Sequence, residues 1–127
     1  MQSTLLLLVE DEDTVRSVLE DSLRDGGFEL MMAGSGAEAL GILESEHDTL
    51  RGLITDINLG SGPSGWDVAK RARELIPELP VVYMSGADAE KWASHGVPNS
   101  TIVTKPFAPA QIVTAISTLL NVTDSHP

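Results

Sequence analysis

Five short apolar runs divide the chain into segments. Each run is three to six residues long, as is typical of strands, and the runs are Leu5–Val9, Phe28–Ala33, Leu53–Thr55, Val81–Met84 and Ile102–Thr104. Because these runs are apolar over most of their length rather than alternating, they indicate strands that are buried on both faces of a sheet. We therefore expect a parallel sheet that is covered by helices on each side.

Helical patterns fill the segments between these runs. In the first segment Val15, Val18, Leu19 and Leu23 follow the i, i+3, i+4, i+8 spacing of one helical face, and Gly26 is placed to end that helix. Further helices are predicted over Ala37–Leu43, Val68–Ile76 and Ile112–Leu120, with a short, weakly patterned one over Ala87–Ser94. A strand followed by a helix, five times over, predicts an α/β fold with right-handed crossovers.

Composition is ordinary for a globular domain except in its charge. The 127 residues are 42% hydrophobic and 21% charged, and 19 Asp and Glu against 8 Lys and Arg give a formal net charge of -11. This balance argues against direct nucleic-acid binding, which needs a basic face to neutralise phosphates. The chain has no Cys, which excludes disulfides and thiolate metal sites.

One domain without a membrane segment is expected. Leu5–Val9 is far shorter than the ~20 apolar residues that a membrane-spanning helix needs, and the amino terminus has no secretory pattern. We therefore expect a cytoplasmic protein that is not attached to a membrane. The domain is predicted over residues 1–121, followed by a polar tail over residues 122–127.

Polar side chains follow four of the five predicted strands. In open α/β sheets, ligands bind beyond the carboxyl ends of the strands. The residues placed there are Glu10, Asp11, Glu12 and Asp13 after the first strand, Asp56 and Asn58 after the third, Ser85 after the fourth and Lys105 after the fifth. The sequence thus predicts carboxylates, a hydroxyl and an ammonium group at one edge of the sheet.

The carboxylates of this set point to phosphoryl transfer. Glu12 and Asp13 fit the first turn of a helix, where acids interact well with the helix dipole, whereas Glu10 and Asp11 precede that turn. Crowded carboxylates raise one another's pKa unless a cation neutralises them, and oxygen ligands without Cys or His suit Mg²⁺. Asp56 ends a buried run and could act as a nucleophile that forms an acyl phosphate.

Four stretches resemble the receiver domain of two-component response regulators. They are LLLVEDE (Leu6–Glu12), LITDINL (Leu53–Leu59), VVYMSGA (Val81–Ala87) and VTKPF (Val103–Phe107), in the order of the family and over essentially the whole chain. The resemblance implies a flavodoxin-like, doubly wound α/β fold. Its five-stranded parallel sheet would have the strand order 2-1-3-4-5, with five surrounding helices.

The resemblance also implies a phosphoacceptor. Asp56 would accept a phosphoryl group from a histidine kinase or a histidine phosphotransfer protein, while Ser85 and Lys105 would bind phosphoryl oxygens. The Lys105–Pro106 bond would be the cis peptide of the family. Beyond catalysing its own aspartyl phosphorylation and slow dephosphorylation, such a domain would not be an enzyme.

Magnesium is the cofactor that the resemblance implies. Asp11, Asp56 and the backbone carbonyl of Asn58 would bind Mg²⁺ directly, and Glu10 would act through a metal-bound water. The family more often has Asp than Glu at the first of these positions. A longer carboxylate there is still compatible with binding through water.

Signalling would proceed through protein contacts. The expected contact face is Ala87–Leu120, on which the chain would act as a monomer or a weak dimer. Ile102 stands where the family often has an aromatic residue that turns inward on activation, so signalling would rest on Ser85 and backbone shifts. The loop Gly60–Ser64 is one residue longer than in chemotaxis-type members.

Three other functions are compatible with part of the sequence. A calcium loop over DINLGSG is disfavoured by Ser61 at the position that needs Gly, and by Pro63. An aspartate-nucleophile phosphohydrolase is disfavoured by Asn58 in place of a second acid, and by the lack of room for a cap domain. A receiver fold that serves only as a binding module, without phosphorylation, remains the alternative.

Overall fold

The computed structural model describes residues 3–86 and 89–124. The elements are β1 (Thr4–Val9), α1 (Asp13–Asp25), β2 (Phe28–Ala33), α2 (Gly36–Glu46), β3 (Gly52–Asp56), α3 (Gly65–Leu75), β4 (Val81–Ser85), a 3₁₀ turn η1 (Ala89–Lys91), α4 (Trp92–His95), β5 (Thr101–Thr104) and α5 (Pro109–Asp124). Each strand agrees with the predicted apolar run to within one residue at either end. The predicted alternation of strands and helices is therefore confirmed.

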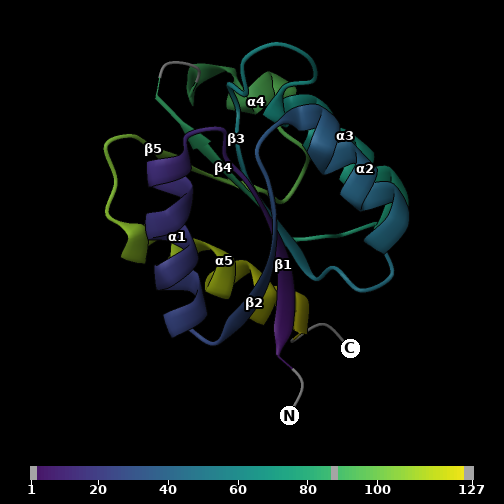
Figure 1. The fold of residues 1–127 in the computed structure, drawn as a ribbon. Helices are drawn as coiled ribbons and strands as arrows, with labels where there is room; N and C mark the ends of the chain where they lie inside the picture. The colour runs from purple at the N-terminus through teal and green to yellow at the C-terminus, as the bar shows by residue number, and fades with distance from the viewer. Residues whose placement is uncertain (1–2, 87–88, 125–127) are drawn as a thin grey trace.

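The five strands form one parallel sheet. Their order is β2-β1-β3-β4-β5, which confirms the predicted topology. Helices α1 and α5 cover one face of the sheet and α2 and α3 cover the other (Figure 1). Because all strands run the same way, the ends of β1, β3, β4 and β5 lie at one edge.

The strands bury side chains on both faces. Along β1, Leu6 and Leu8 pack with residues of α1 and α5, whereas Leu7 and Val9 pack with residues of α2 and α3. All four side chains are fully buried. The alternation of side chains along a strand thus divides the apolar run between two core layers, which explains why the run has no polar face.

Local signals set the ends of the helices. The Ser35 hydroxyl accepts the N–H of Glu38 at the start of α2, and Ser64 and Asp67 form a reciprocal capping box at the start of α3. Helix α1 ends at Gly26, as its spacing predicts. The caps place α2 and α3 directly after the turns that follow β2 and β3.

Helix α5 and the segment after β4 differ most from the predicted helices. Helix α5 continues to residue 124, so the predicted tail over residues 122–127 is helical over 122–124, while residues 125–127 lie outside the described part of the chain. Residues 110–124 contain no Gly or Pro, so the helix can extend beyond its last apolar residues. The helix predicted over Ala87–Ser94 is η1 followed by the single turn of α4, and its residues 87 and 88 are not described.

Side-chain hydrogen bonds hold the short segment around α4. The indole N–H of Trp92 donates to the Ser100 hydroxyl at 2.9 Å, and that hydroxyl donates to the carbonyl of Val97 at 2.7 Å. The N–H of Val97 in turn donates to the hydroxyl of Tyr83 in β4 at 3.1 Å. Burial raises the pKa of the Tyr83 hydroxyl, which therefore stays protonated.

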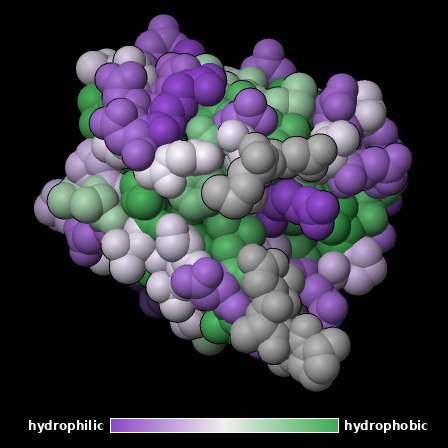
Figure 2. Space-filling view, turned by 90° about the horizontal axis from the view of Figure 1, so that it is seen from below, coloured by the Kyte–Doolittle hydropathy of each residue, from purple (hydrophilic) through white to green (hydrophobic). Residues whose placement is uncertain are grey.

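The amino-terminal edge of the sheet faces away from these segments. Seen from below, it presents hydrophobic residues interspersed with hydrophilic ones (Figure 2). An open cavity of about 450 Å³ lies there, with Leu50, Ile76 and Leu120 in its lining beside the charged Arg51 and Glu78. Among the described residues, no helix is both long enough and apolar enough to cross a membrane.

Candidate functional site

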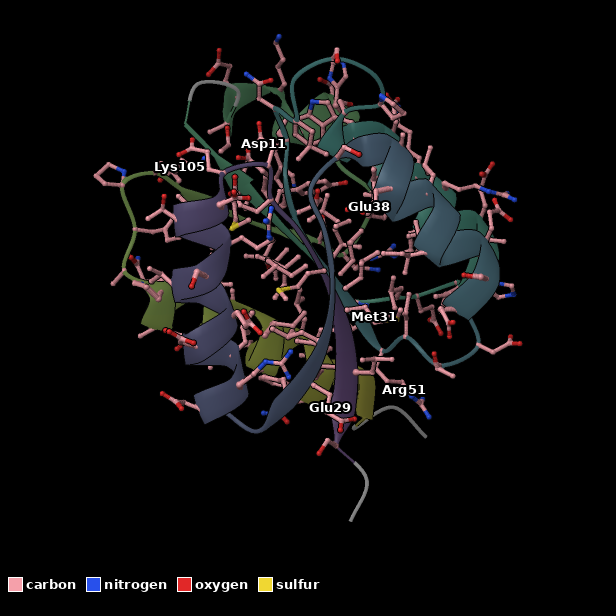
Figure 3. All side chains as sticks on the ribbon, viewed as in Figure 1. Asp11, Glu29, Met31, Glu38, Arg51 and Lys105 are labelled. Carbon is pink, nitrogen blue, oxygen red and sulfur yellow. The ribbon has the colours of Figure 1, made fainter. Side chains whose placement is uncertain are left out.

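The residues predicted to carry chemistry meet at the carboxyl edge of the sheet. Asp11 and Lys105 lie together at this edge, whereas Glu29 and Arg51 lie at the opposite one (Figure 3). The strand register explains the convergence, because Asp56 at the end of β3 pairs with Met84, one residue before the end of β4. Chain segments far apart in sequence therefore deliver their polar ends to one place.

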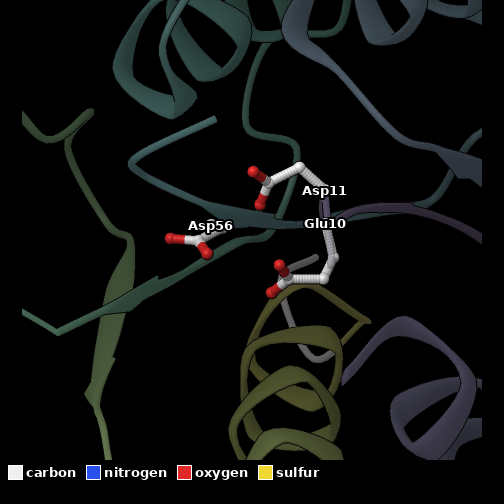
Figure 4. Close-up of side chains that lie close together, drawn as sticks. All are labelled: Glu10, Asp11 and Asp56. Atoms are coloured by element: carbon white, nitrogen blue, oxygen red, sulfur yellow. The ribbon is translucent and has the colours of Figure 1, made fainter. Parts of the chain in front are cut away.

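Three carboxylates form a cluster at this edge, here called the acid cluster. One carboxylate oxygen from each of Glu10, Asp11 and Asp56 lies within 4.8 Å of the others, and the three groups face a common space (Figure 4). Glu10 is fully buried and Asp56 is 5% exposed, whereas Asp11 is exposed. The cluster thus has two buried acids and one that opens to solvent.

Asp56 is held from two sides. Its Oδ2 accepts a hydrogen bond from the Lys105 ammonium at 2.9 Å, and its Oδ1 accepts the backbone N–H of Asn58 at 3.2 Å. Partial burial alone would lower the pKa of Lys105, but the hydrogen bond and negative charge of Asp56 outweigh it and raise that pKa above its ordinary value. Lys105 therefore remains an ammonium group beside the carboxylate.

The carboxylate of Glu10 has fewer hydrogen bonds than that of Asp56. Its Oε2 accepts the backbone N–H of Glu12 at 3.1 Å, but its buried Oε1 has no hydrogen-bond partner among the described residues. Burial, with the nearby charge of Asp56, raises the pKa of Glu10 to about 7 against the opposing effects of the Glu12 N–H and Lys105. A buried carboxylate oxygen without a donor is unfavourable unless a proton or a cation reaches it.

The acid cluster fits a hard divalent cation. Its metal-binding atoms are all carboxylate oxygens. Asp11 is exposed, and the buried Oε1 of Glu10 has no hydrogen-bond partner in the described part of the chain. Mg²⁺ prefers such ligands and retains several waters, for which the exposed side of Asp11 leaves room.

An open cavity of about 460 Å³ lies beside the acid cluster. Its lining includes Asp11 and Asp56 of the acid cluster, together with Asn58, Ser85 and Lys105. Ser85 is 2% exposed and ends β4, so its hydroxyl belongs to the rigid sheet edge rather than to a loop. Asp11, Glu12, Asp56, Asn58, Ser85 and Lys105, all predicted from the sequence, thus line one space large enough for a phosphoryl group, and Glu10 adjoins it through the acid cluster.

Close backbone contacts fix the loop between β3 and α3. A Cβ atom on Gly65 would lie 2.1 Å from the carbonyl oxygen of Asp56, so only Gly allows α3 to start against the phosphoacceptor candidate. The N–H of Gly65 also donates to the carbonyl of Ile57 at 2.8 Å. On the far side of the loop, a Cβ on Gly36 would lie 2.1 Å from the carbonyl oxygen of Pro63.

The structure adds residues to those predicted. Asp13 is the first residue of α1 and Glu12 is its N-cap, which confirms both as helix-start residues, but Glu12 also lines the cavity. Arg16 donates to the backbone carbonyl of Glu10 at 2.8 Å. The sequence does not predict this contact or the close approach of Gly65 to the carbonyl of Asp56, because both depend on how the loops fold back over the sheet edge.

The structure also shows two positions that the family resemblance singled out, the Lys105–Pro106 bond and Ile102. The Lys105–Pro106 peptide bond is cis. Ile102 is half-buried in β5, packs against the core layer beneath α2 and α3, and is paired in register with Tyr83 of β4. An aliphatic side chain thus occupies the position where an aromatic switch would stand.

Sequence comparisons identify the group of proteins that this chain resembles. The model of the response regulator receiver domain matches residues 6–117. Aerobic respiration control protein ArcA of Escherichia coli is 33% identical over 123 residues, which are 95% of this chain and 50% of ArcA. The probable transcriptional regulator ycf27 of Cyanophora paradoxa is 29% identical over 122 residues, 94% of this chain and 49% of that protein. This chain spans about half the length of these relatives.

Solved structures show the same similarity. A response regulator receiver protein from Sinorhizobium medicae has 44% identity and a TM-score of 0.91, with 94% of this chain and 96% of that chain covered. The receiver domain of the hybrid histidine kinase CckA has 33% identity and a TM-score of 0.76, with 91% of this chain and 98% of that chain covered.

Gly65→Ala should destabilise the protein, because the added methyl group collides with backbone rather than with a movable side chain. Overpacking of this kind lowers the free energy of unfolding by about 1–3 kcal/mol. The matched control is Gly41→Ala in α2, where nothing lies within 4 Å, and the better helix propensity of Ala should raise that free energy by about 1 kcal/mol. Urea denaturation measures both. Equal stabilisation by the two substitutions would contradict the close contact.

Glu10 should make the metal-free protein less stable as the pH rises. Its pKa is about 7 in the folded chain and near 4.5 when unfolded, so the folded state binds more protons between these values. The free energy of unfolding should therefore fall between pH 5 and pH 8, by roughly 2–3 kcal/mol relative to Glu10→Gln. Denaturation in EDTA at several pH values measures this difference. A difference that does not change with pH would refute it.

Proposed function

Because the chain belongs to the response regulator receiver domain family of two-component signal transduction, we propose that Asp56 accepts a phosphoryl group from a phosphohistidine. The observation that carries this proposal is the environment of that carboxylate. Asp56 ends a buried strand, lies 2.9 Å from the Lys105 ammonium, and shares a 4.8 Å cluster with Glu10 and Asp11. A buried carboxylate beside an ammonium group and two further acids can receive an anionic group if a cation neutralises the acids and the ammonium binds the incoming oxygens.

Asp56 is the proposed nucleophile. Its two oxygens are oriented by the Lys105 ammonium and by the N–H of Asn58, and each oxygen retains a lone pair. One oxygen attacks the phosphorus of the donor's phosphohistidine. An O–P bond forms while the P–N bond breaks, and the imidazole nitrogen keeps the electron pair of that bond.

Lys105 and Ser85 are the proposed partners of the transferred group. Lys105 already pairs with Asp56, so its ammonium is placed to bind a phosphoryl oxygen once the acyl phosphate has formed. Ser85 lines the same cavity from the end of β4, where its hydroxyl can donate to another phosphoryl oxygen. Both groups then oppose the negative charge that accumulates on the phosphoryl oxygens.

The acid cluster is the proposed Mg²⁺ site. Asp11, Asp56 and the backbone carbonyl of Asn58 would bind the ion directly, and Glu10 would act through a bound water. The bound ion supplies positive charge to the carboxylates and to the phosphoryl oxygens. Two observations support this assignment: the Oε1 of Glu10 has no hydrogen-bond partner within residues 3–86 and 89–124, and Asp11 is exposed.

The proposed partners are proteins. A histidine kinase or a histidine phosphotransfer protein in the cytoplasm would supply the phosphoryl group, and the chain would catalyse only its own phosphorylation and slow dephosphorylation. Output would pass through the face Ala87–Leu120. A phosphoryl group on Asp56 would favour the conformation in which Ser85 moves toward it. The segment that follows Ser85 would then populate its active conformation more often.

Incubation with acetyl phosphate and Mg²⁺ should add one phosphate to the protein. Intact mass spectrometry under mildly acidic conditions measures the addition, and hydroxylamine should remove it because the bond is an acyl phosphate. Asp56→Asn should gain nothing, whereas the control Asp67→Asn, in the capping box of α3, should behave as the wild type. No gain in any of the proteins would favour the binding module instead.

Trp92 should report the phosphorylated state by its fluorescence. Trp92 is 36% exposed, and its indole N–H donates a hydrogen bond to Ser100 in the segment that follows Ser85. A shift of that segment therefore changes the solvent around the ring. Beryllofluoride with Mg²⁺ mimics the phosphoryl group, and Trp66→Phe removes the other indole. We expect a shift of the emission maximum that is absent when Asp56→Asn is added. An unchanged spectrum would contradict the proposed route through Ser85.

A further inference from the structure

One side chain reaches back from α1 to the loop that carries two of the acids. The Arg16 Nη1 donates to the backbone carbonyl of Glu10 at 2.8 Å, and its Nη2 pairs with Asp13 in the first turn of α1. That carbonyl belongs to the peptide that joins Glu10 to Asp11. The hydrogen bond therefore fixes the plane of the peptide from which both carboxylates of the loop extend.

The loop has little else to hold it in this orientation. The N–H of Glu10 donates to the carbonyl of Ala33, and the Oε2 of Glu10 accepts the N–H of Glu12. In the described part of the chain, the side chain of Glu12, the N-cap of α1, forms no capping hydrogen bond. Arg16 is itself confined, since its side chain is 24% exposed and its Nη1 would lie 3.4 Å from a Cβ on Gly34. The guanidinium thus lies between the end of β1 and the turn after β2.

The charge of Arg16 has the wrong sign to favour a cation. A positive group one peptide away from the acid cluster repels Mg²⁺, so if charge alone mattered, its removal would strengthen Mg²⁺ binding. If Arg16 instead orients the loop, its removal weakens binding because the two carboxylates lose their fixed direction. The two accounts predict opposite changes in the same dissociation constant.

We propose that Arg16 is a positioning residue of the acid cluster, which holds the Glu10–Asp11 peptide so that both carboxylates face Asp56. This role rests on the proposed binding of Mg²⁺ at the cluster. Arg16 does not touch the reacting atoms. It acts through the backbone of Glu10, and Lys at this position could supply one of its hydrogen bonds but not the planar fork that spans the carbonyl and Asp13.

Titration with MgCl₂, followed by the amide NMR signals of Asp11 and Asp13, tests the proposal. Arg16→Ala should weaken Mg²⁺ binding about tenfold, the scale expected for a lost hydrogen bond from a charged donor, and should shift the Asp11 amide signal before any Mg²⁺ is added. Arg16→Lys should recover part of the affinity. The matched control is Arg24→Ala on the same helix, whose guanidinium pairs with Glu20 at 2.9 Å and which should keep the wild-type affinity.

Several outcomes would overturn the role of Arg16. One is a dissociation constant for Arg16→Ala that is equal to or tighter than that of the wild type; another is an equal loss in Arg24→Ala. If Arg16→Ala does not fold, the Mg²⁺ affinity of Arg16→Lys tests the proposal instead. Wild-type affinity in Arg16→Lys would contradict the role of the guanidinium that spans the Glu10 carbonyl and Asp13. A wild type that binds no Mg²⁺ would instead overturn the proposed function, and the role of Arg16 with it.

Discussion

The site depends on the burial of acidic groups at the edge of an apolar sheet. Glu10 and Asp56 are almost inaccessible to solvent, and each follows or ends a strand whose other residues form the core. Burial disfavours the charged form of a carboxylate, so such a pair persists only with a compensating charge. Lys105 provides that charge for Asp56 at 2.9 Å, whereas the Oε1 of Glu10 has no partner among the described residues. The site therefore has more buried carboxylate charge than Lys105 alone neutralises, and a bound cation would neutralise the rest.

The parallel sheet is what makes this arrangement possible. Lys105 and Asp56 are 49 positions apart, yet they meet because β3 and β5 end at the same edge on either side of β4. Close packing then fixes the loops around them. Gly65 lets α3 begin against the carbonyl of Asp56, and Arg16 reaches from α1 to the carbonyl of Glu10. The acids are thus held by backbone contacts as well as by one another.

The segment after Ser85 contrasts with this rigid edge. Helix α4 is a single turn with exposed side chains, and it is held by hydrogen bonds that run from Trp92 through Ser100 and Val97 to Tyr83. Tyr83 lies in β4, two residues before Ser85, so the strand that carries the hydroxyl also anchors this segment. Arg73 of α3 also donates to the carbonyls of Pro98 and Asn99 in this segment. A single exposed helical turn that is held mainly by side-chain hydrogen bonds has the properties of a segment that a local change in charge can move.

The sequence by itself determined the order of the elements, the extent of the strands and the identity of the residues at the sheet edge. Apolar runs of strand length, helical spacing and turn residues are local signals, and parallel strands put their carboxyl ends together whatever the details of packing. The extent of α5 was missed because a helix without Gly or Pro can continue beyond its apolar stripe. Only the tertiary structure decided that Oε1 of Glu10 is buried with no partner among the residues that the structure describes, that Gly65 approaches the carbonyl of Asp56 and that Arg16 contacts the acid loop. The spacing of residues in the sequence does not predict these contacts, because they depend on how each loop folds back over the sheet edge.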